Sequence, residues 1–252
     1  MTSNNISTDR VLSKLDEYFA KNDYPGAERH LKYWFDEAVS LNDVKAEILI
    51  CNELIGLSRK TQKKEQTFFY TDKALSILKA FDMEKTVVGA TTYINVATAH
   101  KAFGKAAESI PYFEFARSVY EHELELTDSR LGGLYNNFAL TMVDVSRFDE
   151  AYELYGKALE VMKNAENGEL ECAITYLNIA SAIEVQKGLL DGEDEISEYL
   201  NKASELLDVH ATSSDGYYVF VCEKCASVFG YYGHFMYEKE LLERARKIYE
   251  RN

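Results

Sequence analysis

Two cysteines three residues apart, Cys222 and Cys225, come closest in this sequence to the spacing of a chemical site. A C-x-x-C pair with a histidine downstream, here His234, could supply zinc ligands. No second C-x-x-C pair follows, so the ligand set is incomplete. Both cysteines also fall at apolar positions of a helical pattern, as Cys51 does, and a buried free cysteine behaves as a small apolar residue. The pattern therefore favours packing over a metal or redox site.

The rest of the sequence carries few signs of catalysis. Its histidines show no metal-ligand spacing, and it contains no glycine-rich phosphate loop and no nucleophile elbow. Carboxylates are abundant, but they cluster in stretches such as "EHELELTD" and "DGEDEIS", which are typical of solvated helix faces. We expect a protein that is not an enzyme and that holds no cofactor and no metal.

Composition narrows the class of partner. The 252 residues carry a net charge of −14, which disfavours nucleic acid and anionic membranes as partners. The first residues, "MTSNNISTDR", lack the apolar core of a signal peptide, and no apolar run approaches the roughly 20 residues of a membrane span. Four cysteines without a dense framework fit a reducing compartment. These features predict a cytoplasmic protein that binds neither nucleic acid nor membrane.

The elements that position these residues repeat along the chain. Two prolines and thirteen glycines are few for the turns of a sheet protein, which favours helices. The segments "DKALSIL", "EFARSVY", "GKALEVM", "NKASELL" and "ERARKIY" align on alanines that are spaced by 42, 42, 45 and 42 residues. The alanines are Ala74, Ala116, Ala158, Ala203 and Ala245. Such a period indicates an array of repeated supersecondary units.

A second set of small or apolar residues lies 19 residues upstream of these alanines in four repeats. Its members are Ile55, Ala97, Ala139, Ala180 and Ala226. Between Ala180 and Ala203 the separation is 23, which indicates four inserted residues within "KGLLDGEDEIS". We refer to the two sets as the alanine ladders.

Each repeat is predicted to form two amphipathic helices. In "LYNNFALTMVDVSRFDEAYELYGKALEVM", Tyr135, Phe138 and Met142 share one helical face with Ala139. A hairpin of this size cannot bury its own apolar face, so successive copies must stack. The sequence therefore predicts an all-α chain of stacked helical hairpins.

These residues also carry a resemblance. Their spacing resembles the tetratricopeptide repeat (TPR), and a period of 42 rather than about 34 is similar to the long variant in kinesin light chains and in bacterial peptide-sensing regulators. The segment "FGKAAESIPYFEFARSVYE" is similar to the kinesin-light-chain pattern, in which a proline occurs early in the second helix, and Pro111 occupies that place. We expect it in the first turn, where N–H groups have no intrahelical partner. The resemblance implies one right-handed superhelical solenoid of antiparallel helix pairs over residues 1–252. The approximate repeats are 9–45, 46–84, 88–127, 130–166, 170–209 and 216–252.

Three asparagines recur along the predicted first helices, Asn95, Asn137 and Asn178, 42 and 41 residues apart. At about 100° per residue they lie opposite the packing face. The resemblance implies that first helices line the concave surface and that asparagines at this place hold the backbone of an extended peptide. An asparagine amide matches the N–H and C=O groups of a peptide unit. The alternative is an amide that bonds to the neighbouring helix.

The predicted peptide-binding surface includes residues beside these asparagines. Asn136 lies on the helix flank, and Thr98 and Ser181 lie one turn further along the same stripe. A basic group near the early repeats could take a ligand carboxylate, or could be a solvated helix end. The full predicted set is Asn95, Asn137, Asn178, Asn136, Thr98, Ser181, Arg59, Lys60 and Lys101.

The expected function is a non-catalytic scaffold or adaptor that holds a protein or an extended peptide in its concave groove. One alternative is a bacterial peptide-sensing module. The first repeat begins by about residue 10, so we expect it to lack a DNA-binding domain. The other alternative is a scaffold that self-associates as a homodimer through an end patch. The tyrosines of that patch are Tyr217, Tyr218, Tyr231 and Tyr232.

Overall fold

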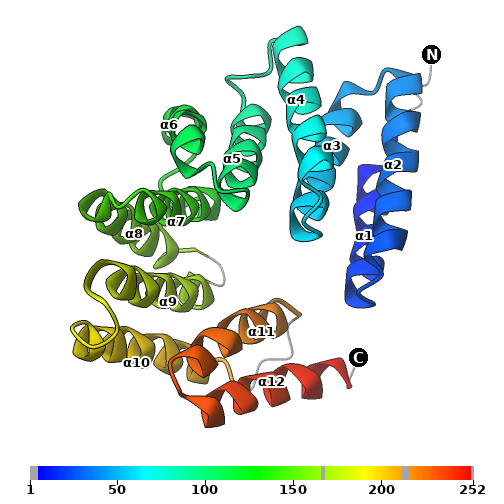
Figure 1. Ribbon diagram of the computed structural model, residues 1–252. Helices are drawn as coiled ribbons and strands as arrows, with labels where there is room; N and C mark the ends of the chain where they lie inside the picture. The colour runs from blue at the N-terminus through cyan, green and yellow to red at the C-terminus, as the bar shows by residue number, and fades with distance from the viewer. Residues whose placement is uncertain (1–4, 166–167, 212–215, 251–252) are drawn as a thin grey trace. The chain divides into compact units, whose positions relative to one another are not determined.

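The computed structural model describes residues 5–165, 168–211 and 216–250, which form helices and turns and contain no strand (Figure 1). The helices in this part of the chain are α1 (Thr8–Ala20), α2 (Tyr24–Leu41), α3 (Val44–Lys60), α4 (Lys64–Ala80), α5 (Val87–Ala102), α6 (Ala106–Glu123), α7 (Ser129–Asp144), α8 (Phe148–Met162), α9 (Gly168–Lys187), α10 (Glu193–Val209), α11 (Gly216–Tyr231) and α12 (Phe235–Tyr249). None of them combines the length and apolar composition that crossing a bilayer requires.

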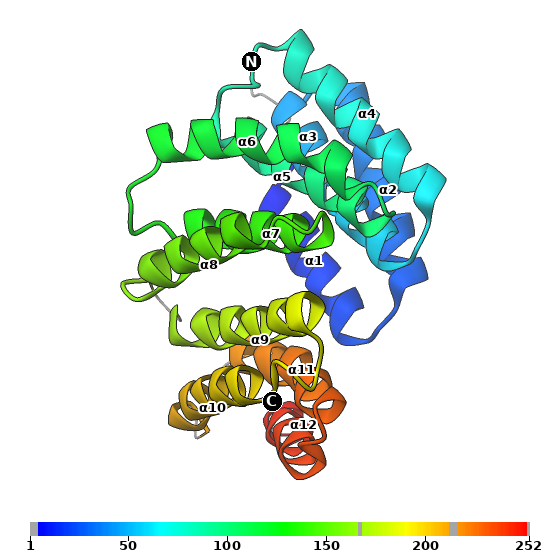
Figure 2. The same ribbon diagram turned by 60° about the vertical axis from the view of Figure 1, so that its left-hand side comes forward.

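The helices pack in consecutive antiparallel pairs, α1 with α2 through to α11 with α12. The predicted all-α architecture of helical hairpins is therefore confirmed. The chain divides into two compact units, which we call unit 1 (Met1–Leu124, α1 to α6) and unit 2 (Glu125–Asn252, α7 to α12). Figure 2 shows the hairpins of unit 2 stacked in chain order. A single solenoid through both units stays a prediction.

The helix bounds differ in detail from the predicted repeats. Helix α3 begins at Val44, two residues before the predicted second repeat at 46. Asp43 explains the earlier start, because its carboxylate caps the helix by accepting a hydrogen bond from the Ala46 N–H at 3.2 Å. The predicted repeat ends at residues 166 and 252 lie outside the described residues.

The alanine ladders lie in the buried core of the chain. All ten residues are at most 2% exposed. A small side chain lets two helix backbones approach closely, and a larger one would force them apart. The burial of both ladders confirms the core that the 42-residue period predicts.

Each hairpin turns on a residue in the left-handed region. These residues have φ between 53° and 84° and are Asn22, Gln62, Gly104, Ser146, Gly188 and Gly233. In the α7–α8 turn, for example, the Ser146 N–H donates to the Val143 carbonyl at 2.9 Å and the Arg147 N–H donates to the Met142 carbonyl at 2.8 Å. The left-handed residue thus satisfies the last carbonyls of the first helix and reverses the chain.

The four inserted residues are divided between a helix and a turn. Gly188 follows Ala180 by eight residues, whereas Ser146 follows Ala139 by seven, so α9 gains one residue. Helix α10 begins five residues after Gly188, whereas α8 begins two residues after Ser146, so the connection gains three. The alanines after the insertion, Ala203 and Ala245, are again 42 residues apart, because all the inserted residues precede α10.

Pro111 lies deeper in its helix than predicted. Helix α6 begins at Ala106, so Pro111 is its sixth residue and belongs to the second turn. The expectation of a first-turn proline is therefore wrong. At this depth the missing N–H removes a bond to the carbonyl four residues earlier, a cost that packing of α6 against α5 must offset.

Candidate binding surface

Two of the predicted site residues of unit 2 contact each other. Asn136 is 8% exposed, and its amide NH2 donates to the Thr175 hydroxyl at 3.1 Å. The Asn136 amide oxygen accepts a hydrogen bond from the Asn178 NH2 at 2.9 Å. Both bonds join α7 to α9. Asn136 and Asn178 thus form the contact between neighbouring helices that was the alternative to peptide binding.

Three other predicted residues direct their donors to their own helices. The Asn137 NH2 donates to the Gly133 carbonyl at 2.9 Å within α7. The Thr98 hydroxyl donates to the Asn95 carbonyl at 2.9 Å, and the Ser181 hydroxyl donates to the Leu177 carbonyl at 3.1 Å. Asn137 and Ser181 remain half-buried, so parts of their polar groups still face solvent.

Unit 1 contains the same polar contact with one bond missing. The Asn52 NH2 of α3 donates to the Thr92 hydroxyl of α5 at 3.0 Å, as Asn136 does to Thr175. The Asn52 amide oxygen is buried and has no hydrogen-bond partner in the described residues. Asn95 stands in the place of Asn178, and its side chain makes no hydrogen bond to the residues that the structure describes.

Sequence reasoning did not single out Asn52. The signal was present, because Asn52 precedes Ile55 by three residues, as Asn136 precedes Ala139. The intervening first helix has Ile94 at this place, so the asparagine occurs in the second and fourth repeats but not in the third. A search at the 42-residue period alone therefore passes over it.

A cavity of about 510 Å³ opens between first helices of unit 1. Its lining comes from α1, α3, the α3–α4 turn and α5, and consists of Phe19, Glu53, Gly56, Leu57, Arg59, Lys60, Gln62 and Ala102. Two predicted site residues, Arg59 and Lys60, therefore lie together in it. Lys101, half-buried on α5, adjoins the lining at Ala102. We call this lining, together with Asn95, the α3 surface.

Two charged side chains of the α3 surface, Glu53 and Arg59, have no partner among the residues that the structure describes. Arg59 is half-buried, and its guanidinium makes no ion pair or hydrogen bond with the described part of the chain. Burial lowers the pKa of Arg59. Glu53 is also half-buried, and its carboxylate has no partner among the same residues. Burial, with the nearby Asp16 carboxylate, raises the pKa of Glu53. Each group has lost water without gaining an opposite charge.

Lys60 is held at the rim of the cavity by aromatic rings. Its ammonium lies 5.7 Å from the centre of the Phe19 ring and 5.0 Å from that of Tyr24. The negative face of an aromatic ring attracts a cation at this distance. Lys60 therefore adds a second positive charge to the cavity lining, next to Arg59 in the sequence.

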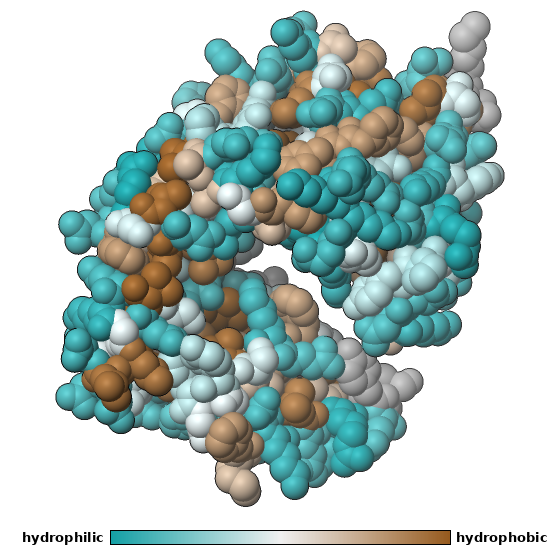
Figure 3. Space-filling view, viewed as in Figure 1, coloured by the Kyte–Doolittle hydropathy of each residue, from teal (hydrophilic) through white to brown (hydrophobic). Residues whose placement is uncertain are grey.

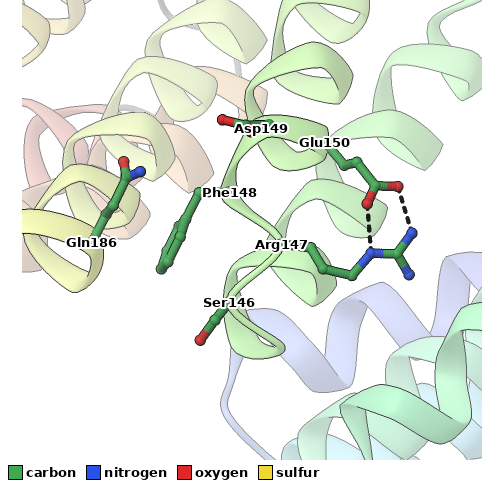
Figure 4. Close-up of a pocket in the computed structure, with 6 residues that line it drawn as sticks. All are labelled: Ser146, Arg147, Phe148, Asp149, Glu150 and Gln186. Atoms are coloured by element: carbon green, nitrogen blue, oxygen red, sulfur yellow. Dashed lines mark hydrogen bonds and ion pairs between the residues drawn. The ribbon is translucent and has the colours of Figure 1, made fainter.

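A second cavity, in unit 2, is lined by an arginine that has a partner. It measures about 230 Å³ and lies at the α7–α8 turn and the end of α9, as Figure 4 shows with its six lining residues. The Arg147 guanidinium points away from Phe148 and Gln186 and donates two hydrogen bonds to Glu150, at 2.6 and 2.5 Å. Because this arginine is paired, the cavity presents no comparable unpaired cation.

The four cysteines are buried at packing positions, with at most 7% exposure, and all are free thiols. Burial raises the pKa of both Cys51 and Cys225 to about 12. A thiol with such a pKa is protonated at neutral pH and is a poor nucleophile. In the described residues, no three His, Cys, Asp or Glu side chains group closely enough to hold a metal ion.

The tyrosines considered as an end patch mostly serve helix contacts. Tyr218 is fully buried, and the Tyr217 hydroxyl donates to the Glu171 carboxylate. The hydroxyls of Tyr231 and Tyr232 both donate to the Glu184 carboxylate, at 2.6 and 2.7 Å. These bonds tie α11 to α9.

No protein-family model matches the sequence. Among curated proteins, the chain is 24% identical over 172 residues to kinesin light chain-related protein 3 of Arabidopsis thaliana. The match covers 68% of this chain but only 25% of the Arabidopsis protein. The chain thus spans about a quarter of the length of this curated relative.

Solved structures resemble the fold at low sequence identity. BtubC (BKLC) from P. vanneervenii superposes with a TM-score of 0.60 at 17% identity, covering 88% of this chain and 89% of that chain. A Rap protein complexed with Competence and Sporulation Factor gives 0.63 at 14%, covering 94% and 62%. The TPR-like repeats of a Podosopora anserina kinesin light chain give 0.53 at 14%, covering 80% and 94%. The chain therefore has the fold of TPR-like repeat proteins, as the resemblance of its sequence implies.

Proposed function

We propose that this chain is a non-catalytic scaffold that binds an extended protein segment on the α3 surface of unit 1. The observation that carries the proposal is the half-buried Arg59 guanidinium, which lines a cavity of about 510 Å³ and has no partner in the described residues. A cation that has lost water without a counter-charge is stabilised by a ligand that supplies one.

The Asn95 amide, about two helical turns before the cavity residue Ala102 on α5, supports a peptide as the ligand. Asn95, Thr98 and Ala102 follow one another at helical spacing on α5, and Ala102 lines the cavity. The unbonded Asn95 side chain can therefore meet the backbone of a segment that extends from the cavity. In this proposal Asn136, Asn137 and Asn178 stabilise unit 2 instead.

The relatives are compatible with this proposal. A Rap protein with this fold forms a complex with Competence and Sporulation Factor. We propose that this chain likewise holds a partner. At 14% identity the Rap protein supports the fold alone, and the residues proposed to hold the partner are those of the α3 surface.

The test is selection of peptides from a random display library by the full chain, followed by affinity measurements by fluorescence anisotropy. The double variant Arg59→Ala with Asn95→Ala should weaken selected peptides by about tenfold or more. The matched control is Lys79→Ala with Asn201→Ala, which changes exposed residues outside the cavity and should bind as the wild type does. Failure to select any peptide, or equal affinities for both double variants, would overturn the proposal.

A second candidate function is self-association through unit 2. The end of α9 and the α9–α10 connection expose Val185 at 62%, Leu189 at 51% and Leu190 at 86%. Figure 3 shows hydrophobic residues interrupting the hydrophilic surface along the side of unit 2 where this connection lies. Adjacent exposed apolar residues are typical of interaction sites. Sedimentation at increasing concentration tests this function, which would be excluded if the wild type stays monomeric throughout.

A further inference from the structure

Two opposite charges share one cavity in unit 1 without meeting. Glu53 and Arg59 both line it, and neither has a partner in the described part of the chain. A charge that is partly removed from water and left unpaired costs free energy in the unbound protein. The two groups also do not bond to each other, although they belong to the same helix. A ligand that carries one basic and one acidic group can therefore pair with Glu53 and Arg59 at the same time and lower the free energy of both.

The separation of the two charges sets the spacing that a ligand must have. Glu53 and Arg59 are six residues apart on α3, about 9 Å along the axis at about 1.5 Å per residue. An extended chain advances about 3.3 Å per residue, so about three of its residues cover this distance. Between the two charges lies Gly56, where an added Cβ would meet nothing within 4 Å. A ligand backbone can therefore lie close to α3 there.

Neighbouring charges give the cavity an acidic end and a basic end. The Asp16 carboxylate of α1 is close enough to Glu53 to raise its pKa. Lys60, held over Phe19 and Tyr24, is next to Arg59 in the sequence and lines the same cavity. A uniformly acidic segment would meet repulsion at Glu53, and a uniformly basic one would meet it at Arg59. Repulsion at the wrong end is a source of specificity.

Building on the proposed function, we propose that unit 1 selects extended segments that carry one basic and one acidic side chain about three residues apart. The basic side chain pairs with Glu53, and the acidic side chain pairs with Arg59. If the ligand chain runs parallel to α3, its basic residue comes before its acidic residue, and if it runs antiparallel the order is reversed. This arrangement distinguishes the partner from the many acidic or basic segments that carry one sign of charge only.

The experiment compares peptides selected from one random library by the wild type and by three full-length variants. The swapped variant, Glu53→Arg with Arg59→Glu, exchanges the two ends while keeping the net charge. Its control, Glu65→Arg with Lys79→Glu, makes the same exchange at exposed positions of α4 outside the cavity. The neutral variant, Glu53→Gln with Arg59→Gln, removes both charges with little change of shape. Circular dichroism verifies that each variant is folded.

The wild type and the control should enrich peptides with opposite charges two to four positions apart in one order, and the swapped variant should enrich the reverse order. Removing one charge from a selected peptide should weaken its binding to the wild type about tenfold. Peptides that bind without a charge pattern, or a swapped variant that keeps the original order, would overturn the inference while the proposed function stands. Selection of no peptide at all would overturn both. Should the swapped variant fail to fold, loss of charge-order preference in the neutral variant decides the question.

Discussion

At the scale of single residues, equivalent asparagines have different surroundings. Asn178 donates to Asn136, so the NH2 and the oxygen of the Asn136 amide each make one hydrogen bond. Asn95 occupies the equivalent place in unit 1, where the Asn52 oxygen lies buried without a partner in the described residues. Residue type and repeat position are the same in both cases. The difference therefore lies in the hydrogen bonds that the tertiary structure provides, which distinguish a structural amide from one that is available to a ligand.

This difference predicts unequal effects on stability. Asn178→Ala should lower the free energy of unfolding by about 1–3 kcal/mol, because it leaves the buried Asn136 oxygen without its donor. Asn95→Ala should change it by less than about 0.5 kcal/mol, since no side-chain bond is lost. Urea denaturation measures both. Equal losses would show that Asn95 also has a structural role.

His100 predicts a pH dependence of stability. Its imidazole packs edge-on against Phe68, with ring centres 5.1 Å apart, and its Nδ1 is buried without a hydrogen bond in the described residues. The Glu108 carboxylate lies 3.6 Å from that nitrogen, beyond hydrogen-bond distance but close enough to pair with a protonated imidazole, so it opposes part of the pKa shift. Burial lowers the pKa of His100 from its ordinary 6.5, and Lys105 lowers it further. The unfolded chain then binds more protons than the folded chain below about pH 6.5.

Stability should therefore fall as the pH decreases from 7.5 toward 5.5. His100→Gln should remove part of this slope, because glutamine does not titrate in this range. Urea denaturation at several pH values compares the two proteins. Identical slopes would show that His100 binds protons equally in the folded and unfolded chains.

At the scale of elements, the hairpin turns determine where paired helices meet. Three of the six left-handed turn residues are glycine and three are not. A residue with a Cβ is strained in the left-handed region by about 1–2 kcal/mol, although glycine loses more conformational freedom on folding. A turn whose left-handed residue is not glycine is therefore less stable than the same turn with glycine would be.

Ser146→Gly should accordingly raise the free energy of unfolding by about 0.5–1 kcal/mol, because Ser146 has φ of 61°. The matched change is Gly188→Ala at φ of 84°, where an added Cβ meets nothing within 4 Å and only backbone strain is introduced. It should lower the free energy by about 1 kcal/mol. Thermal unfolding measures both, and a destabilised Ser146→Gly protein would contradict the role of strain.

At the scale of the whole molecule, the chain consists of two compact units. In unit 1 a continuous set of buried side chains runs from Val11 on α1 to Ala99 on α5. Every residue of the α3 surface also belongs to unit 1. The unit thus holds both a core of its own and the complete proposed binding surface.

A fragment of residues 1–124 should therefore unfold cooperatively and bind the selected peptides within about threefold of the affinity of the full chain. The fragment 125–252 should not bind them, since its Asn136 and Asn178 amides bond to each other. Circular dichroism and anisotropy test both fragments. A folded first fragment that has lost binding would show that unit 2 supplies part of the site.

The sequence by itself determined the hairpin architecture, the buried alanine ladders and the size of the insertion after Ala180. A fixed period specifies which residues face a neighbouring helix, because stacking each hairpin on the next buries the same positions every time. The tertiary structure alone decided which amides bond to each other, that Pro111 lies in a second turn, and that Glu53 and Arg59 have no partner in the described part of the chain. Such pairings depend on which side chains of other helices come within about 3 Å, and helical periodicity does not specify this. The predicted row of asparagines therefore separates into side chains bonded within unit 2 and one amide of the α3 surface, Asn95, that is available to a ligand.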